Sequence, residues 1–240
     1  MMTNADFLSA VRQSFAEFVY SGTSRSTKKL VPLHGSIARD IHERLGNGYG
    51  ILSQGFESGR EGSIPGRYMD KKVDITISHA GQPVGGIAVK FVMQNYSQNA
   101  NNYFENMLGE TANIRSARCP YFQVFIIPDR LPYYTSGGVF KHWETFTEGN
   151  IHKYAVLDGD DPSVRYHTPD KMLIYVIHLP DIGEVRDKAD YLLKNRAWLD
   201  RTEPGTASFK TVPVAQFSNS VILNDYERFA EKVYHTILAR

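Results

Sequence analysis

An aspartate and a lysine lie on two neighbouring segments in which apolar and polar residues alternate. Asp74 belongs to KKVDITIS, residues 71–78, and Lys90 belongs to IAVKFVM, residues 87–93. Alternation with a period of two is typical of half-buried strands, and the turn-forming run HAGQPVGG between them predicts a β-hairpin. A carboxylate can hold a divalent cation, and a nearby ammonium can orient a water or stabilise charge developing on a phosphate. Catalytic chemistry is therefore one interpretation of the pair, and a solvated strand face is the alternative.

The same period assigns a face of the hairpin to each side chain. Asp74 is expected opposite the apolar residues of its strand, and Ala88 and Lys90 are expected together on the polar side of theirs. The apolar residues expected on the other face are Val73, Ile75, Ile77, Ile87, Val89 and Phe91. In simple register, Asp74 and Lys90 then share one face of adjacent strands.

A metal site needs a second acid, and the segment after the hairpin contains two. Residues 103–117, YFENMLGETANIRSA, are predicted to form a helix with an apolar stripe facing the sheet. At 100° per residue, Glu110 falls at the border of that stripe, whereas Glu105 points further toward solvent. We therefore favour Glu110 and keep Glu105 as the alternative, while ordinary solvated glutamates would have the same spacing.

These residues resemble the signature of a nuclease superfamily. The sequence D-I-T-I-S, a turn and I-A-V-K-F is similar to the two-strand motif of the PD-(D/E)xK superfamily, which includes most type II restriction endonucleases. Asp74 matches the aspartate of the motif and Lys90 its lysine, but Ala88 stands where an acid is usual. Some restriction enzymes of the superfamily have a small residue there and take the glutamate from the following helix. The resemblance covers about residues 66–128.

The resemblance implies a type II restriction endonuclease that hydrolyses phosphodiester bonds in double-stranded DNA with Mg²⁺. Asp74 and either Glu110 or Glu105 would hold the metal, a backbone carbonyl near Val89 would complete its coordination, and Lys90 would assist the attacking water. Restriction enzymes that read palindromes are commonly two-fold dimers, so a homodimer is expected. Two alternatives stay open: a catalytically inactive DNA- or protein-binding module of the same fold, and a structure-specific repair or junction nuclease.

Further polar residues near the hairpin are candidates for auxiliary roles. Enzymes of this kind often carry another acid on the helix before the hairpin, which Glu43, or less favourably Asp40, would supply here. Cations can contact phosphates and amides can contact base edges. The residues expected to reach DNA are Arg67, Lys71, Lys72, Asn95, Asn99 and Asn101. A plain polar surface explains the same residues.

Composition and missing motifs narrow the function classes. The chain has 240 residues, of which 42% are hydrophobic, so it can bury a sizeable core; its net charge of +1 is compatible with an acidic metal site inside a basic DNA cleft. The single Cys119 excludes an internal disulfide and cysteine-rich zinc sites. No phosphate-binding loop, dinucleotide fingerprint, hydrolase elbow or HExxH pair is present. No run approaches the ~20 apolar residues that cross a bilayer, so we expect a cytoplasmic protein without a membrane partner.

The order of the elements predicts an α/β fold with a restriction-endonuclease-like core, in which a central mixed β-sheet is flanked by helices. We expect one nuclease-like domain over residues 1–240, with a core at about 33–180 and helical additions at both ends. Besides the hairpin, strands are expected at 121–128, which should run parallel to a neighbour, and at 172–179. Helices are expected at 6–20, 33–45, 103–117, 139–147, 184–195 and 223–238. Residues 95–102 are expected to form a polar loop, and residues 46–70 loops with short strands.

Overall fold

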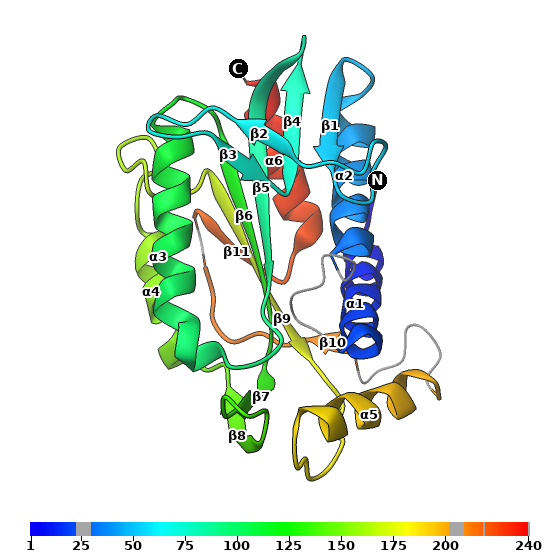
Figure 1. Cartoon of the computed structure of the whole chain (residues 1–240). Helices are drawn as coiled ribbons and strands as arrows, with labels where there is room; N and C mark the ends of the chain where they lie inside the picture. Colours follow the sequence, from blue (N-terminus) through cyan, green and yellow to red (C-terminus); the bar gives the residue numbers. More distant parts are fainter. Residues whose placement is uncertain (23–29, 202–208, 218, 240) are drawn as a thin grey trace.

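The computed structural model describes residues 1–22, 30–201, 209–217 and 219–239. The fold is α/β, with a mixed sheet between two groups of helices (Figure 1). The helices in the described residues are α1 (Asn4–Ser21), α2 (Val31–Leu45), α3 (Tyr96–Arg115), α4 (Glu148–Asp158), α5 (Lys188–Leu199) and α6 (Tyr226–Leu238). No helix in these ranges is long and apolar enough to cross a membrane.

The central sheet joins antiparallel and parallel strands. Along the sheet the strands are β1 (Tyr49–Ser53), β4 (Ile75–His79), β5 (Gln82–Phe91), β6 (Tyr121–Pro128), β9 (Lys171–His178) and β10 (Lys210–Thr211), and β11 (Val221–Leu223) also pairs with β9. β4 and β5 form the predicted hairpin, and β5, β6 and β9 are parallel. All eight residues of β6 are buried, as expected of a strand covered on both faces.

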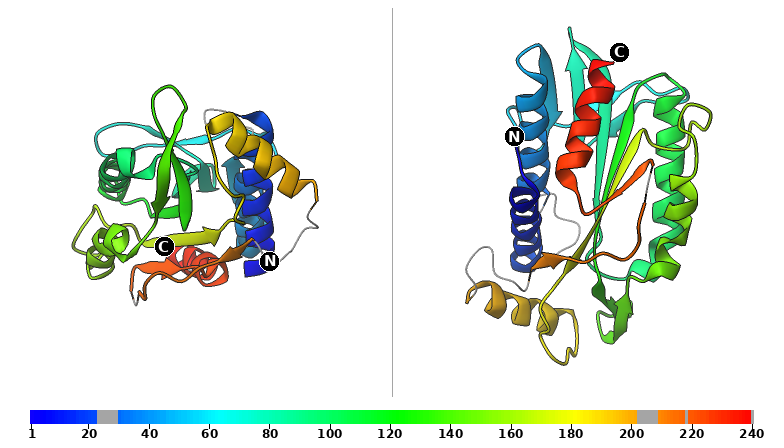
Figure 2. Two further views of the ribbon diagram at one scale, coloured as in Figure 1. Left: turned by 90° about the horizontal axis from the view of Figure 1, so that it is seen from below. Right: turned by 180° about the vertical axis from the view of Figure 1, so that it is seen from behind.

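Helices cover both faces of the sheet. α1, α2 and α6 share one apolar core with Ile75, Ile87 and Val124 of the sheet, whereas α3 and α4 share another with Phe125 and Ile127. The two views of Figure 2 show α6 and α1 on the face opposite α3. Two small antiparallel pairs extend from this framework, namely β2 (Gly62–Ile64) with β3 (Lys71–Val73) and β7 (Arg130–Tyr134) with β8 (Phe140–Thr145).

Two predicted elements are wrong. The helix expected at 139–147 is strand β8, whose run FKHWET is rich in the aromatic and β-branched residues that favour strands. The loop expected at 95–102 is instead the first part of α3, because Glu144 of β8 accepts hydrogen bonds from the backbone N–H groups of Tyr96 (2.6 Å) and Ser97 (3.0 Å). A carboxylate at a helix N-terminus satisfies donors that have no partner within the helix.

Candidate active site

Asp74 lies at a break in the hairpin, between β3 and β4. Its neighbour Val73 packs in a small cluster with Ile114 of α3, whereas Ile75 on the other side packs in the core against α1 and α2. The expectation that Val73 and Ile75 share a face is therefore wrong. The strand alternation is interrupted at Asp74, and the chain passes there from the β2–β3 pair into the central sheet.

The carboxylate of Asp74 is fixed to the second strand of the hairpin. Ile75 and Ile87 form the last residue pair between β4 and β5. Beyond that pair, Asp74 Oδ2 accepts a hydrogen bond of 2.7 Å from the backbone N–H of Val89. Since Val89 is the middle residue of the triplet Ala88-Val89-Lys90, the first acid is held against the residue that precedes the lysine.

The surroundings of Asp74 disfavour its charged form. The pKa of Asp74 is raised from 3.8 to about 6, mainly by burial and in smaller part by the Glu110 carboxylate, whereas the Val89 hydrogen bond and the Lys90 and Lys71 ammonium groups oppose the rise. A desolvated carboxylate beside a second carboxylate is stabilised by a cation that binds to both. A cation bound near Asp74 would therefore favour its charged form.

Lys90 lies within the electrostatic reach of both acids. Loss of hydration lowers the pKa of Lys90, while the charges of Asp74 and Glu110 raise it. Its Nζ lies 4.5 Å from the ring centroid of Tyr103 on α3, a cation–π contact that directs the side chain toward that helix. Lys90 also lines a cleft of about 330 Å³ between the end of β5 and the start of α3, together with Gln98 and Asn99.

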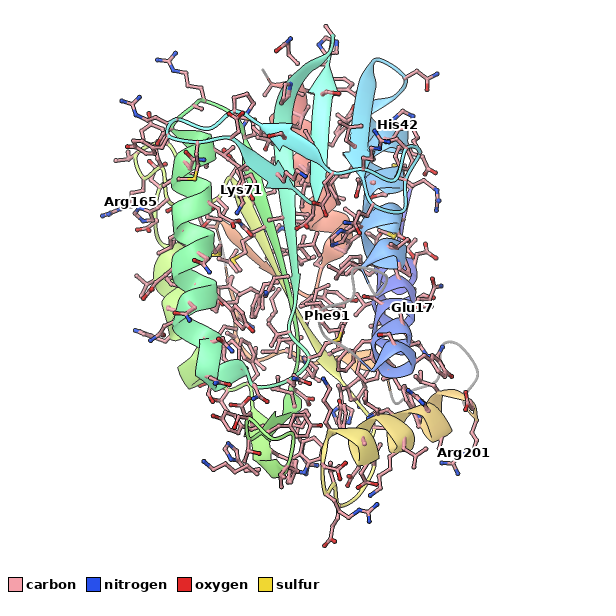
Figure 3. The ribbon with its side chains drawn as sticks, in the orientation of Figure 1. Glu17, His42, Lys71, Phe91, Arg165 and Arg201 are labelled. Carbon is pink, nitrogen blue, oxygen red and sulfur yellow. The ribbon has the colours of Figure 1, made fainter. Side chains whose placement is uncertain are left out.

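The structure separates the two helix glutamates. Glu110 Oε1 is 2.5 Å from Lys71 Nζ, and Glu110 Oε2 accepts a hydrogen bond of 3.4 Å from the hydroxyl of Tyr121. Lys71 begins β3 and lies beside α3 (Figure 3). Glu105 is exposed, and its charge acts on Lys153 instead. Asp74, Lys90 and Glu110 thus lie within electrostatic range of one another, whereas the charge of Glu105 acts elsewhere.

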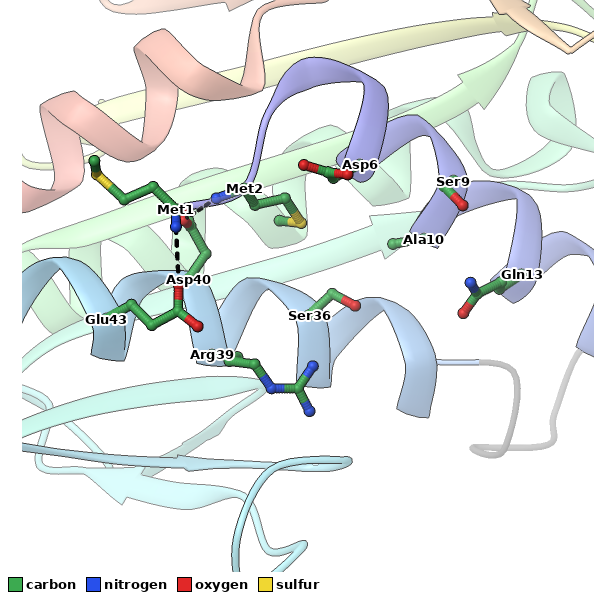
Figure 4. Close-up of a pocket in the computed structure, with 10 residues that line it drawn as sticks. All are labelled: Met1, Met2, Asp6, Ser9, Ala10, Gln13, Ser36, Arg39, Asp40 and Glu43. Carbon is green, nitrogen blue, oxygen red and sulfur yellow. Dashed lines mark hydrogen bonds and ion pairs between the residues drawn. The ribbon is translucent and has the colours of Figure 1, made fainter. Parts of the chain in front are cut away.

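The auxiliary acid expected on the helix before the hairpin is not at this site. Glu43 binds the N-terminal ammonium of Met1 at 2.9 Å (Figure 4). Asp40 is 2% exposed and accepts hydrogen bonds of 2.9 Å from both Arg44 Nε and the hydroxyl of Tyr226. Both acids of α2 are bound by partners on the first residues of the chain, on α2 itself or on α6.

A histidine and a glutamate that the sequence analysis missed lie at Asp74. Ligand atoms of His34, Glu61 and Asp74 all lie within 4.8 Å of one another. His34, in the first turn of α2, is fully buried, and neither ring nitrogen has a hydrogen-bond partner among the described residues. Burial lowers the pKa of His34 to about 4, so its imidazole is neutral at pH 7. The single sequence signal was a histidine within an apolar helix stripe, which is also typical of a core residue.

The residues expected to contact DNA have different environments. Lys72 and Arg67 are exposed, and the guanidinium of Arg67 lies 5.9 Å from the ring centroid of Tyr68. Lys71 binds Glu110 as described above. Asn95 uses its amide for the fold, because it exchanges two hydrogen bonds of 2.9 Å with the backbone of Tyr134. Among the remaining candidates, Asn99 lines the Lys90 cleft and Asn101 is exposed on α3.

Comparison with known proteins gave no match to a family model, a curated protein or a solved structure.

Proposed function

We propose that the chain is a metal-dependent endonuclease of the type II restriction class, which hydrolyses phosphodiester bonds in double-stranded DNA. The observation that carries the proposal is the hydrogen bond from the backbone N–H of Val89 to Asp74. It fixes an acid beside a triplet that ends in Lys90, while Glu110 approaches from α3 and raises the pKa of Asp74. Two acids and a lysine within electrostatic range of one another form a constellation suited to phosphodiester hydrolysis.

The residues present fit a divalent cation such as Mg²⁺. Asp74 and Glu110 offer hard carboxylate oxygens, and the raised pKa of Asp74 is the electrostatic condition that a bound cation would relieve. The backbone carbonyl near Val89 remains the expected third ligand. When bound, such a cation would polarise the scissile phosphate and lower the pKa of a bound water.

The side chains around the site have distinct tasks in this proposal. Lys90 donates hydrogen bonds to the attacking water or to a phosphate oxygen, and the ring of Tyr103 limits the positions of its ammonium group. Lys71 and Tyr121 hold the two oxygens of Glu110, so this carboxylate keeps a defined orientation. Exposed Arg67 and Lys72 would contact the DNA backbone beside the site.

The assembly and location proposed for the enzyme follow from its substrate. A homodimer would match the two-fold symmetry of a palindromic site, and sedimentation with cognate DNA should give two copies per duplex. The cytoplasm is the proposed compartment, because DNA is accessible there and the single Cys119 would remain reduced.

Cleavage of plasmid and phage DNA in Mg²⁺ tests the proposal. Wild type should give discrete fragments whose sequenced ends share one motif, and Lys90→Ala should abolish them. Lys232→Ala, which removes an exposed lysine of α6, is the matched control and should cut like wild type. A gel shift without cutting would favour the inactive binding module, and cutting restricted to branched DNA would favour the junction nuclease.

A further inference from the structure

Asp74 has two neighbours that the nuclease signature does not use. His34 comes from α2, and Glu61 directly precedes β2; with Asp74 they bring one imidazole and two carboxylates together, with ligand atoms within 4.8 Å of one another. Ligands bound to one cation at about 2.1 Å lie about 3–4 Å apart. A contraction of at most about 1–2 Å would therefore place all three around a single ion.

The environment of His34 points independently to a missing ligand. The residue has 0% relative exposure, and within the described parts of the chain both of its ring nitrogens lack a hydrogen-bond partner. A buried polar group without a partner costs about 1–3 kcal/mol, and native proteins contain few of them. A metal ion bound to one ring nitrogen would supply the interaction that the protein itself does not provide.

Close packing of backbone brings His34 and Glu61 to the same place. A Cβ atom on Gly35, next to His34, would lie 2.3 Å from the carbonyl oxygen of Gly55, so the first turn of α2 rests directly on the loop that leads to Glu61. Gln54 Nε2, in the same loop, donates a hydrogen bond of 2.7 Å to Glu61 Oε1. Both side chains are thus held toward Asp74 by the fold.

We propose that His34, Glu61 and Asp74 bind a divalent first-row transition metal ion such as Mn²⁺, with one nitrogen and two oxygen ligands. The imidazole distinguishes this site from an ordinary magnesium site, because Mg²⁺ takes oxygen ligands and water, whereas imidazole suits the ions of iron, nickel, copper and zinc. Mn²⁺ suits the two carboxylates and is the member of the first-row series used as the probe. The proposal rests on the proposed function only for the use of the ion, which would share Asp74 with the nuclease centre.

Binding of Mn²⁺ without DNA tests this site directly. Titration of the metal-free full chain, followed by the electron paramagnetic resonance signal of free Mn²⁺, should show one site that a tenfold excess of Mg²⁺ does not displace. His34→Gln and Glu61→Gln should each weaken Mn²⁺ binding at least about tenfold. His42→Gln is the matched control, because His42 also lies on α2 with an unpartnered ring nitrogen but is not in the cluster, and it should bind like wild type.

The outcomes separate this inference from the nuclease proposal. Thermal unfolding of each metal-free variant verifies that it folds, and Glu61→Gln carries the test if His34→Gln does not fold. Equal Mn²⁺ affinity in wild type and the folded cluster variants, or no binding by wild type, would overturn the metal site even if DNA is cut in a Lys90-dependent manner. Conversely, Mn²⁺ binding that depends on His34, without any DNA cleavage, would support the site and refute the nuclease.

Discussion

Replacing Asp74 with asparagine should stabilise the metal-free protein. The pKa of Asp74 is raised from 3.8 to about 6, mainly by burial, so its charged form destabilises the fold at neutral pH. Asparagine has nearly the same shape, and its Oδ1 can still accept the hydrogen bond from the N–H of Val89. The substitution therefore removes the charge and keeps the contact that fixes the hairpin.

The magnitude follows from the raised pKa. The change from 3.8 to about 6 corresponds to about 3 kcal/mol at pH values well above 6. Since the carboxylate is not fully buried, and solvent screens part of this effect, we expect a net gain of about 1–2 kcal/mol. In a protein of this size that is a rise of roughly 3–6 °C in the unfolding temperature.

The stability difference between Asp74→Asn and wild type should depend on pH. The folded-state pKa lies above the unfolded value, so protonation of wild-type Asp74 recovers its lost stability as the pH falls through 6 toward 4. The advantage of Asp74→Asn should be full at pH 8 and reduced to about a third of that value at pH 4.5. Other groups titrate in both proteins and largely cancel in the difference.

Chemical denaturation in EDTA at pH 8, 6 and 4.5 measures this difference, with Asp70→Asn as the control at an exposed neighbouring aspartate. The control should differ from wild type by less than about 0.5 kcal/mol at every pH. A less stable Asp74→Asn at pH 8, or an advantage that does not change with pH, would refute the electrostatic description of the site.

Three further outcomes are expected from single substitutions. Lys90→Ala should lower DNA cleavage by about 10²–10³-fold, with Lys90→Arg also impaired because a planar guanidinium does not replace a point charge; kinetics on plasmid DNA measures both. Asn95→Ala should lower the free energy of unfolding by about 1–3 kcal/mol, because the amide holds the backbone of Tyr134, with no specific loss in DNA affinity. Gly35→Ala should destabilise the fold by about 1–3 kcal/mol in urea denaturation, since its Cβ would meet the Gly55 carbonyl at 2.3 Å.

The local periodicity of apolar residues in the sequence was sufficient to predict much of the central sheet. The hairpin of β4 and β5 and the parallel strand β6 follow from period-two alternation and from a continuous apolar run. The placement of Ala88 and Lys90 away from the apolar face of β5 also follows, because Ile87 and Val89 belong to the opposite core. These patterns depend on nearest neighbours along the chain, which a single sequence records.

The parts of the fold and of the candidate site that the sequence did not predict depend on contacts between residues far apart along the chain. α3 begins at Tyr96 because Glu144, 48 residues later, accepts its N–H. The break at Asp74 depends on pairing between β2 and β3, two strands of three residues each whose pattern is too short to detect. His34 meets Asp74 only because Gly35 packs on the loop from β1, and no periodicity encodes that contact.

Glu110 decides whether a helix acid replaces the one missing at Ala88. The carboxylate of Glu110 raises the pKa of Asp74 but also binds Lys71. A catalytic role and a structural role of Glu110 therefore predict different cleavage activities for variants of the ion pair. If Glu110 is a metal ligand, Glu110→Gln should lower the cleavage rate by about tenfold to a hundredfold. Glu105→Gln, which changes an exposed glutamate of the same helix, should cut like wild type.

Lys71→Met distinguishes the two roles, because it removes the same ion pair but leaves the Glu110 carboxylate in place. This pair is partly exposed, so its loss should lower stability by no more than about 1 kcal/mol in either variant. If Glu110 acts only through Lys71, both variants should lose cleavage in parallel. If Glu110 binds the metal, Lys71→Met should retain cleavage in saturating Mg²⁺, because the released carboxylate is free to bind the ion. Parallel loss would therefore refute Glu110 as the metal ligand and would leave Ala88 without a substitute acid.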